Sequence, residues 1–393
     1  MKIAVLTSGI LPVPAVQGGA VENLVDFYLE YNDQHQLHDI TVYSVWHPDV
    51  EQHPARQSGV NHYIYIKVNT LANRTRKCLF SHLHKDGYYH HSIEYFLWKA
   101  IQRIKKEHYD LIIVENRPGF VLMLKQSVMC PVVLHLHNGF LNPDTKNAQE
   151  IFDGYQHIIS VSDFITAQVN SINPAIRKCS TVYNAIDLQH FYSSPSYPRE
   201  RVGIVDEDFL LVYSGRLREE KGILPLIQAV KKLDTIPHLK LLIIGASGYG
   251  KGQQPSPFVL RLTAECESIS SQVVFTGFID YHDVPSYLKM ADVAVVPSMW
   301  EEPFGLTVVE AMAVGLPLIT TRSGGIPEIC QNVATIVERD HIADNLAAAI
   351  LDLYEHPEKR KQMAAASLER SKLFDKETYA KNVFAALEKL ETT

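Results

Sequence analysis

Residues 299–315 read MWEEPFGLTVVEAMAVG and place carboxylates in an otherwise apolar run. Glu302 comes just before a turn at 303–305, and Glu310 lies among small and aliphatic residues that predict a buried helix. A charge that leaves water without a partner is costly, or it is neutralised by a shift of its pKa. We therefore expect a polar partner to meet each of these two side chains.

Short runs of β-branched and aliphatic residues recur along the chain, and helical patterns lie between several of them. Such nearly continuous apolar strands are typical of sheets covered on both faces, hence of mostly parallel strands with right-handed helical crossovers. The sequence therefore predicts an α/β fold. The predicted strands are 3–6, 40–45, 63–68, 111–114, 132–136, 157–161, 209–213, 239–244, 273–276, 293–296 and 318–320.

The length of 393 residues and a Pro/Ser-rich break at 193–198 predict two domains. We expect an N-terminal α/β domain over 1–195 and a C-terminal α/β domain over 196–375. A polar-amphipathic helix in 376–393 is expected to pack back on the N-terminal domain. Ligands of open parallel sheets bind beyond the carboxyl ends of the strands, so the informative residues should follow strands.

The composition, with 46% hydrophobic and 21% charged residues, is that of an ordinary globular protein. The net charge of −7 argues against a nucleic-acid binder. The apolar N-terminus is interrupted by Pro12 and Pro14 and favours a strand and loop over a signal peptide. No segment has the length of a membrane span. Five widely spaced cysteines fit reduced thiols, so a cytoplasmic protein is predicted; they are Cys78, Cys130, Cys179, Cys266 and Cys330.

Two loops that follow strands could hold phosphate groups. Gly18 and Gly19 precede a helix, whose N-terminal N–H groups suit a diphosphate, although the glycines could equally make a plain turn. After the strand 209–213, Arg216 and Lys221 stand in a turn before the next helix. Two cations there could clamp a doubly charged group, or they could pair with neighbouring glutamates in a solvated turn.

The second half of the chain resembles glycosyltransferase family 4. Residues 214–222 read SGRLREEKG, residues 297–317 contain the pattern P-S-x-x-x-E-P-F-G-L-x-x-x-E-A-M-A-x-G-x-P, and 324–328 read GGIPE, in the order and spacing of that family. The first half is similar more loosely, at Gly18-Gly19, at HLHN in 135–138 and at YNAID in 183–187. The resemblance implies a retaining enzyme with the GT-B fold, in which two Rossmann-like parallel-sheet domains face each other across a cleft. It implies that the domain 1–195 binds the acceptor and that the domain 196–375 binds the nucleotide sugar.

The resemblance also implies roles for individual residues. Glu302 would contact hydroxyls of the transferred sugar, and Glu310 would accept hydrogen bonds from the ribose; the alternative for both is an ion pair within the protein. His137 would lie at the donor sugar, or pack as a structural histidine, and His135 is expected on the opposite face of the strand. The implied catalytic residues are His137, Glu302, Arg216 and Lys221, and the implied donor-binding residues are Gly18, Gly19, Asn184, Gly215, Arg216, Lys221, Phe278, Glu302, Phe304, Gly305, Leu306, Thr307 and Glu310.

The predicted reaction moves a hexose from a nucleotide diphosphate sugar to a hydroxyl of a glycan or lipid-linked acceptor, in bacterial polysaccharide or glycoconjugate assembly. Arg216, Lys221 and helix amides would stabilise the departing diphosphate without a metal, and no cofactor is expected beyond the donor, for which a UDP-sugar is favoured. A nucleotide-sugar epimerase, a phosphorylase and a catalytically silent sugar-nucleotide-binding subunit are the alternatives. An oxidoreductase is disfavoured because no G-x-G-x-x-G turn follows a strand.

Two segments depart from the surrounding pattern. Basic and aromatic residues gather between 68 and 109, including 73–77, several histidines in 82–91 and YFLW at 95–98. They could bind an anionic or lipid-linked acceptor, or lie on the inner face of a membrane. Alternatively, they could form an ordinary solvated helix face. The loop 245–258 is longer than the G-x-G-P of many family members, which leaves the identity of the donor open.

Overall fold

The computed structural model describes residues 1–57, 59–71, 73, 77, 90–246 and 256–390. The chain divides into two compact units. Unit 1 comprises Met1–Asn184 and the C-terminal segment from Lys376, and unit 2 comprises Ala185–Asp375. The division lies before the 195/196 position expected from the Pro/Ser-rich break, because helix α7 (Leu188–Ser193) packs on helix α11 (Leu306–Ala313) of unit 2.

Unit 1 is built on a seven-stranded sheet in which every neighbouring pair of strands is parallel. The short β7, with sequence CST, has too few apolar residues to be predicted from sequence. Across the sheet the strands are β3 (Asn61–Ile66), β2 (Asp39–Val45), β1 (Lys2–Leu6), β4 (Leu111–Glu115), β5 (Val132–Leu136), β6 (His157–Ser160) and β7 (Cys179–Thr181).

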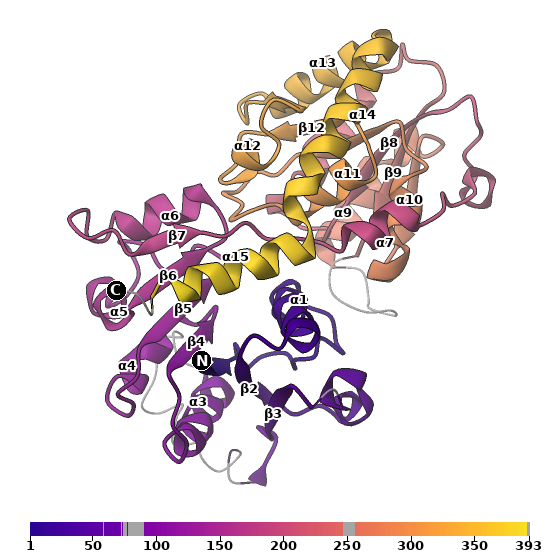
Figure 1. Cartoon of the computed structure of the whole chain (residues 1–393). Coiled ribbons are helices and arrows are strands. Elements are labelled where there is room, and N and C mark those ends of the chain that lie inside the picture. The colour runs from indigo at the N-terminus through magenta and orange to yellow at the C-terminus, as the bar shows by residue number, and fades with distance from the viewer. Residues whose placement is uncertain (58, 72, 74–76, 78–89, 247–255, 391–393) are drawn as a thin grey trace. The chain divides into compact units, whose positions relative to one another are not determined.

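The C-terminal helix α15 (Lys376–Glu388) belongs to unit 1 and packs on α1 (Ala20–His35), as Figure 1 shows. The rings of Phe384 and Tyr28 meet edge to face with centroids 6.0 Å apart. The apolar side of α15 is therefore covered by the first helix of the chain. The other α-helices whose bounds fall within the described residues of unit 1 are α3 (His91–Ile104), α4 (Val121–Leu124), α5 (Ala148–Gly154) and α6 (Asp163–Asn170).

Unit 2 has a six-stranded sheet that is also parallel throughout. Its strand order is β10 (Val273–Gly277), β9 (Leu239–Ile244), β8 (Phe209–Ser214), β11 (Val293–Val296), β12 (Leu318–Thr321) and β13 (Ala334–Val337). Besides α7 and α11, the described part of this unit contains the α-helices α8 (Ile223–Lys231), α9 (Pro257–Glu265), α10 (Val284–Leu288), α12 (Ile326–Ile329), α13 (Ile342–Glu355) and α14 (Pro357–Ser371).

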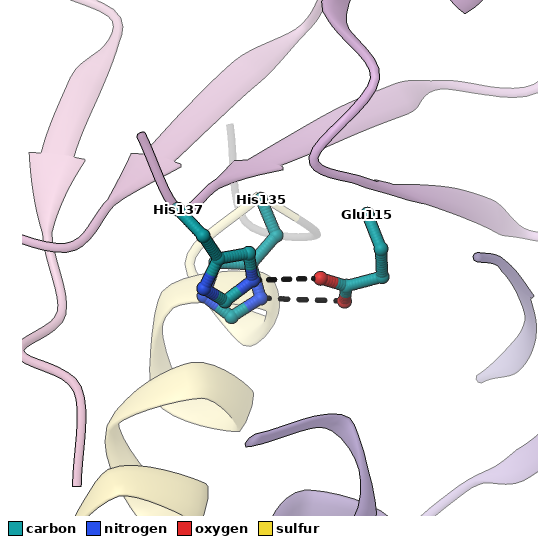
Figure 2. Close-up of side chains that lie close together, drawn as sticks. All are labelled: Glu115, His135 and His137. Atoms are coloured by element: carbon teal, nitrogen blue, oxygen red, sulfur yellow. Dashed lines mark hydrogen bonds and ion pairs between the residues drawn. The ribbon is translucent and has the colours of Figure 1, made fainter. Parts of the chain in front are cut away.

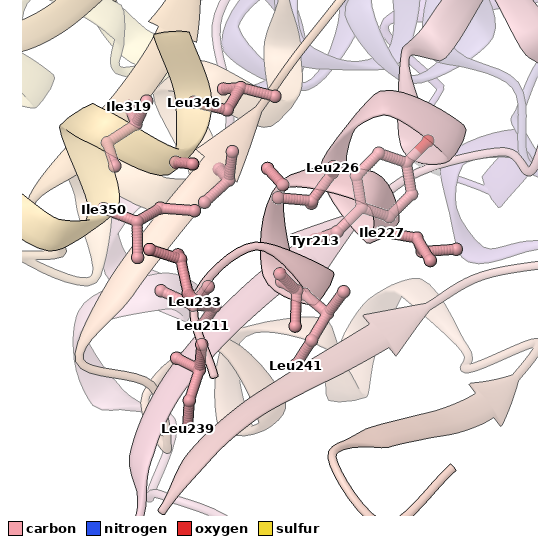
Figure 3. Packing of buried hydrophobic residues seen from close by; sticks show 14 of the residues in the cluster. Leu211, Tyr213, Leu226, Ile227, Leu233, Leu239, Leu241, Ile319, Leu346 and Ile350 are labelled. Atoms are coloured by element: carbon pink, nitrogen blue, oxygen red, sulfur yellow. The ribbon is translucent and has the colours of Figure 1, made fainter. Parts of the chain in front are cut away.

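Aliphatic side chains fill the core of unit 2 between the sheet and its helices. Leu211 and Leu241 of neighbouring strands, Leu226 of α8 and Ile350 of α13 are all buried in one cluster (Figure 3). Burying a leucine or isoleucine side chain contributes about 1.5–3 kcal/mol. This core fixes the strands whose carboxyl ends carry the candidate site.

The strand order reverses once in each unit, which creates one switch point in each sheet. In unit 1 the chain moves outward from β1 on one side and from β4 on the other, and in unit 2 the same happens at β8 and β11. Loops diverge at such a switch point and leave room for a ligand beyond the strand ends. Across the described part of the chain, no helix is long and apolar enough to cross a membrane.

Candidate functional site

The switch point of unit 2 brings together residues from the two main sequence motifs. Lys221 follows β8 and Glu302 follows β11, and Lys221 Nζ lies 2.6 Å from Glu302 Oε1. Ser298 donates its hydroxyl to the same oxygen at 2.7 Å. The polar partners expected for Glu302 are therefore Lys221 and Ser298.

The loops that carry these residues interlock through their backbones. The Met299 amide donates to the Glu220 carbonyl at 2.8 Å, and the Gly325 amide donates to the Glu302 carbonyl at 2.8 Å. Gly222 has a φ of 71°, and a Cβ placed on it would lie 1.7 Å from the Pro297 carbonyl oxygen. Only glycine fits this approach, so the position of the Lys221 loop depends on it.

Helix α11 begins at the same place. Gly305, with a φ of 107°, is its N-cap residue, and the amides of Leu306 and Thr307 belong to the first turn, where no intrahelical partner exists. Such an N-terminus favours a negatively charged ligand. Phe304, predicted to bind the donor, lies just before this N-cap, and its ring is buried against Phe374 with centroids 5.8 Å apart.

Glu310 lies inside α11 and is 6% exposed. Its partner is the hydroxyl of Tyr281, which starts the 3₁₀ helix η7 (Tyr281–Asp283) after β10. Burial raises the pKa of Glu310 to about 7, and the bond from Tyr281 acts in the opposite direction. A carboxyl group that titrates near neutral pH can accept hydrogen bonds from a diol once it is ionised.

The other residues predicted in unit 2 lie beside these loops. Gly215 directly follows β8 and donates its amide to the Ile244 carbonyl at 3.0 Å. The Arg216 carbonyl accepts the Tyr213 hydroxyl at 2.9 Å, which holds the turn. Phe278 is half-buried and directly follows β10, the edge strand.

The switch point of unit 1 begins with the predicted glycine loop. Gly18 and Gly19 have φ angles of 71° and 110°, and Gly19 caps the N-terminus of α1. Glu22 occupies the first turn of that helix, accepts the Ser8 hydroxyl at 3.3 Å, and has its pKa raised by burial. Sequence reasoning missed Glu22. Its carboxylate would repel a phosphate at this helix end unless it were protonated.

Three buried side chains meet at the carboxyl ends of β4 and β5 (Figure 2). Glu115 ends β4, and its two carboxylate oxygens face the two histidines around the end of β5. His137 Nε2 lies 2.9 Å from Glu115 Oε2, and His135 Nδ1 lies 3.3 Å from Glu115 Oε1. Tyr28 donates its hydroxyl to Oε1 at 2.9 Å. The carboxylate thus has three hydrogen-bonding neighbours.

Both histidines point the same way, so the expectation that His135 lies on the opposite face is wrong. Side chains alternate along a strand with a period of two, and residues two apart therefore share a face. The imidazole rings of His135 and His137 lie with centroids 4.2 Å apart. This shared direction lets one carboxylate meet both rings.

The electrostatics of this cluster follow from burial. Burial alone would raise the pKa of Glu115, but the two histidines outweigh it and bring the pKa to about 2. Burial lowers the pKa of His137, and the neighbouring His135 lowers it further, while Glu115 acts in the opposite direction. Glu115 is therefore an ionised acceptor facing two imidazoles.

Asn184 is buried in unit 1, and the interaction of its side chain with the His137 ring raises the pKa of that histidine, against the larger lowering effect of burial. Among the described residues, neither Asn184 Oδ1 nor His137 Nδ1 has a hydrogen-bond partner. The resemblance implied that His137 lies at the donor sugar and that Asn184 binds the donor. The structure brings them together, along with Glu115, which sequence reasoning did not select although it ends the apolar run LIIVE.

The basic and aromatic segment is described only in part. Residues 72, 74–76 and 78–89 lie outside the described residues, as do 247–255 of the long loop. In α3, Tyr95 and Phe96 are buried, and Trp98 is 36% exposed. Two of these aromatic residues therefore belong to the core of unit 1 rather than to its surface.

Comparison with known proteins identifies the group to which the chain belongs. The family model "Glycosyltransferase Family 4" matches residues 32–190, and "Glycosyl transferases group 1" matches 198–370. Spore coat protein SA of Bacillus subtilis (strain 168) is 29% identical over 409 residues, covering 99% of this chain and 100% of that protein. A lipopolysaccharide 1,2-N-acetylglucosaminetransferase of Salmonella typhimurium is 25% identical over 263 residues, covering 65% of this chain and 67% of that protein.

Solved structures agree on the fold. Anabaena Alr3699/HepE in complex with UDP superposes with a TM-score of 0.73 at 20% identity, over 99% of this chain and 100% of that chain. The same protein in complex with UDP-glucose gives a TM-score of 0.72 at 20% identity, over 100% of both chains. The two parallel sheets and these likenesses show the GT-B fold, and the two family models show that the chain belongs to the glycosyltransferases of the family 4 type.

Proposed function

We propose that this chain is a retaining, metal-independent hexosyltransferase. It takes the hexose from a nucleotide diphosphate sugar and delivers it to a hydroxyl of a glycan or a lipid-linked acceptor in the assembly of a bacterial polysaccharide or glycoconjugate. The observation that carries this proposal is the meeting of Lys221, Glu302 and the N-terminus of α11 at the switch point of unit 2. Cytoplasmic placement and contact with a membrane surface remain predictions from the sequence.

The groups at this point have the chemistry that a departing diphosphate requires. Arg216 and Lys221 supply positive charge, and the first-turn amides of α11 supply oriented N–H donors. In the structure Lys221 already pairs with Glu302. A bound diphosphate would draw Lys221 toward itself, which would free Glu302 to meet hydroxyls of the transferred sugar.

The proposed reaction balances without an activated side-chain nucleophile. The bond between the anomeric carbon and the diphosphate oxygen breaks, and the electron pair leaves with the diphosphate. The acceptor oxygen forms the new bond to the anomeric carbon on the same face, and its proton passes to the leaving phosphate oxygen. The task of the protein is to orient the partners and to stabilise the charge that develops on the diphosphate.

The nucleotide is proposed to be uridine diphosphate. Anabaena Alr3699/HepE, which shares the fold, has been crystallised with UDP and with UDP-glucose. Glu310 suits the ribose because it lies inside α11, beyond the helix N-terminus proposed for the diphosphate. The name of the Salmonella relative supports a hexosamine or hexose as the transferred unit and a lipid-linked glycan as the acceptor class.

A panel of UDP-, GDP- and ADP-sugars tests the proposal. The full-length protein is incubated with each donor, with and without glycan and lipid-linked acceptors, and the products are analysed by mass spectrometry and by NMR of the anomeric proton. The proposal predicts an acceptor-dependent product that keeps the anomeric configuration of the donor. Conversion of a nucleotide sugar into its epimer without an acceptor would assign the protein to another reaction, and inversion at the anomeric carbon would overturn the retaining mechanism.

A further inference from the structure

The carboxylate of Glu115 determines which ring nitrogen of His137 carries a proton. An ionised carboxylate only accepts hydrogen bonds, so a ring nitrogen at hydrogen-bonding distance from it must donate. His137 Nε2, 2.9 Å from Glu115 Oε2, is such a nitrogen. A neutral imidazole has a single N–H, and the Nδ1 of His137 is then left as an acceptor.

Neighbouring groups hold this arrangement in place. Tyr28 and His135 both hydrogen-bond to Oε1 of Glu115, which leaves Oε2 for His137. The backbone amide of His137 donates to Asn116 Oδ1 at 3.0 Å. Both the ring and the backbone of His137 are therefore anchored, and the ring has one orientation relative to the carboxylate.

The free acceptor of His137 lies where ligands of such sheets bind. His137 follows β5 at the carboxyl edge of the sheet and is 8% exposed, whereas His135 lies inside the strand and is 0% exposed. His137 Nδ1 is buried and has no hydrogen-bond partner among the described residues. A buried acceptor without a partner is costly, which points to a donor group that arrives with a ligand.

A metal centre is the competing explanation, because Glu115, His135 and His137 offer ligand atoms within 4.8 Å of one another. Histidines that bind metals almost always donate their second ring N–H to a carboxylate, a carbonyl or water. Within the described residues, neither His135 Nε2 nor His137 Nδ1 has a hydrogen-bond partner at bonding geometry. The geometry therefore favours protons, rather than an ion, between the carboxylate and the rings.

We propose that Glu115 is a positioning residue. Together with Tyr28 and His135, it holds His137 as the Nε2–H tautomer, so that Nδ1 accepts a hydrogen bond from a hydroxyl of the bound sugar substrate. This inference rests on the proposed glycosyl transfer. In this proposal Glu115 acts through His137 and does not itself contact the reacting atoms.

The substitution Glu115→Gln reverses the tautomer with little change of volume. Tyr28 and His135 donate to Oε1, so the glutamine keeps its carbonyl oxygen there and turns its NH₂ group toward His137 Nε2. An NH₂ group only donates, and the ring must then carry its proton on Nδ1. The acceptor offered to the substrate becomes a donor. We expect kcat/KM to fall by tenfold or more, roughly the effect of leaving one buried hydrogen-bonding group unsatisfied.

Two readouts on the full-length protein test this inference. NMR of protein with ¹⁵N-labelled histidine is expected to show a protonated Nε2 and an unprotonated Nδ1 for His137, assigned by its loss in His137→Gln, and the reverse in Glu115→Gln. Transfer rates are measured on the same samples. Tyr109→Phe is the control. It removes a buried hydroxyl that is hydrogen-bonded to Tyr43 at 2.9 Å, and Tyr109 precedes the N-terminal end of β4, whereas Glu115 lies at its C-terminal end. It should change neither the tautomer nor the rate.

Several results would overturn the inference. These are a wild-type ring protonated on Nδ1, an unchanged tautomer in Glu115→Gln, or a reversed tautomer with an unchanged rate. Stoichiometric binding of Zn²⁺ that Glu115→Gln abolishes would show a metal centre instead. A wild-type protein that transfers no sugar would remove the proposed function and with it the purpose of the tautomer. An active wild-type protein with the wrong tautomer would refute this inference alone.

Discussion

Lys221 and Glu302 form an ion pair between the loops that follow β8 and β11, with Nζ 2.6 Å from Oε1. The pair joins two residues that are 81 positions apart in the sequence. Glu302 is 7% exposed, and pairing removes the cost of burying its charge alone. A diphosphate that binds to Lys221 must compete with this contact, so the two residues cannot act independently.

We expect the effects of substituting this pair to be non-additive. Lys221→Ala should weaken donor binding and lower turnover by about tenfold or more, because a charge-assisted hydrogen bond is worth about 1.5–3 kcal/mol. Arg216→Ala should do the same. In Lys221→Ala/Glu302→Gln the combined loss should be smaller than the product of the single losses. Lys231→Ala, which removes a surface ion pair with Glu265, is the control. Near wild-type rates in both Lys221→Ala and Arg216→Ala would refute the proposal that these two residues bind the diphosphate.

Substitutions of the two glutamates should change the kinetics in different ways. Glu310 is proposed to hold the ribose, which changes little during the reaction, so Glu310→Gln should chiefly raise KM. Glu302 is proposed to meet the sugar that gains positive charge, so Glu302→Gln should lower kcat with a smaller effect on donor affinity. Steady-state kinetics and donor titration measure both variants. Losses confined to KM in both would leave Glu302 with a role in binding only.

The stability of unit 2 should depend on the protonation of Glu310. Burial raises its pKa from 4.5 to about 7, so the folded state holds a proton that the unfolded chain releases between these values. The stability contributed by this proton is fully present below pH 4.5 and is lost as the pH rises through 7. A shift of this size corresponds to about 3 kcal/mol.

Glu310→Gln should remove this dependence. Relative to the wild type, the variant should have a similar free energy of unfolding at pH 4 and a higher one at pH 8, as measured by urea denaturation at a series of pH values. Glu355→Gln, at an exposed position in α13, is the control. A parallel pH profile for Glu310→Gln and the wild type would contradict the raised pKa.

Alanine substitutions at Gly203 and Gly222 should distinguish the effect of backbone strain from that of a steric clash. Gly222 and Gly203 have φ angles of 71° and 73°, but a Cβ on Gly203 would meet nothing within 4 Å, whereas one on Gly222 would strike the Pro297 carbonyl. Gly203→Ala should cost about 1–2 kcal/mol of stability, the strain of a left-handed residue. Gly222→Ala should cost more and should also weaken donor binding, because the Lys221 loop must move. Equal losses of stability and unchanged donor affinity in both would show that this loop tolerates displacement.

We expect the transfer activity to survive a chelator. The proposed site uses Arg216, Lys221 and helix amides where other transferases use a divalent ion. Transfer rates in EDTA should match those in untreated protein, and added Mg²⁺ or Mn²⁺ should change them little. Loss of activity in EDTA that either ion restores would show that a metal takes part.

The parallel strands and the unit 2 site could be predicted from sequence because their signals are local. The apolar runs mark β8 and β11, and the residues just after them, including Lys221 and Glu302, must lie at one edge of the sheet. The short β7 and β13 were not predicted, and their residues are only half-buried. Their pairing is set by neighbouring strands rather than by their own hydrophobicity.

The partners within the site could not be predicted in the same way. Tyr281 reaches Glu310 and Tyr28 reaches Glu115 through tertiary packing that no spacing in the sequence records. The prediction for His135 was wrong because residues two apart in a strand, such as His135 and His137, share a face of the sheet. Glu115 itself carries a readable signal, since a carboxylate that closes an apolar strand lies at the edge where ligands bind.

A crystal structure of the protein with a UDP-sugar tests the central claim most directly. We expect the diphosphate to lie against Arg216, Lys221 and the first-turn amides of α11. The ribose hydroxyls should lie at Glu310, and Glu302 should be released from Lys221 and turn toward the sugar. A nucleotide bound away from the carboxyl ends of β8 and β11, with the ion pair between Lys221 and Glu302 intact, would contradict it.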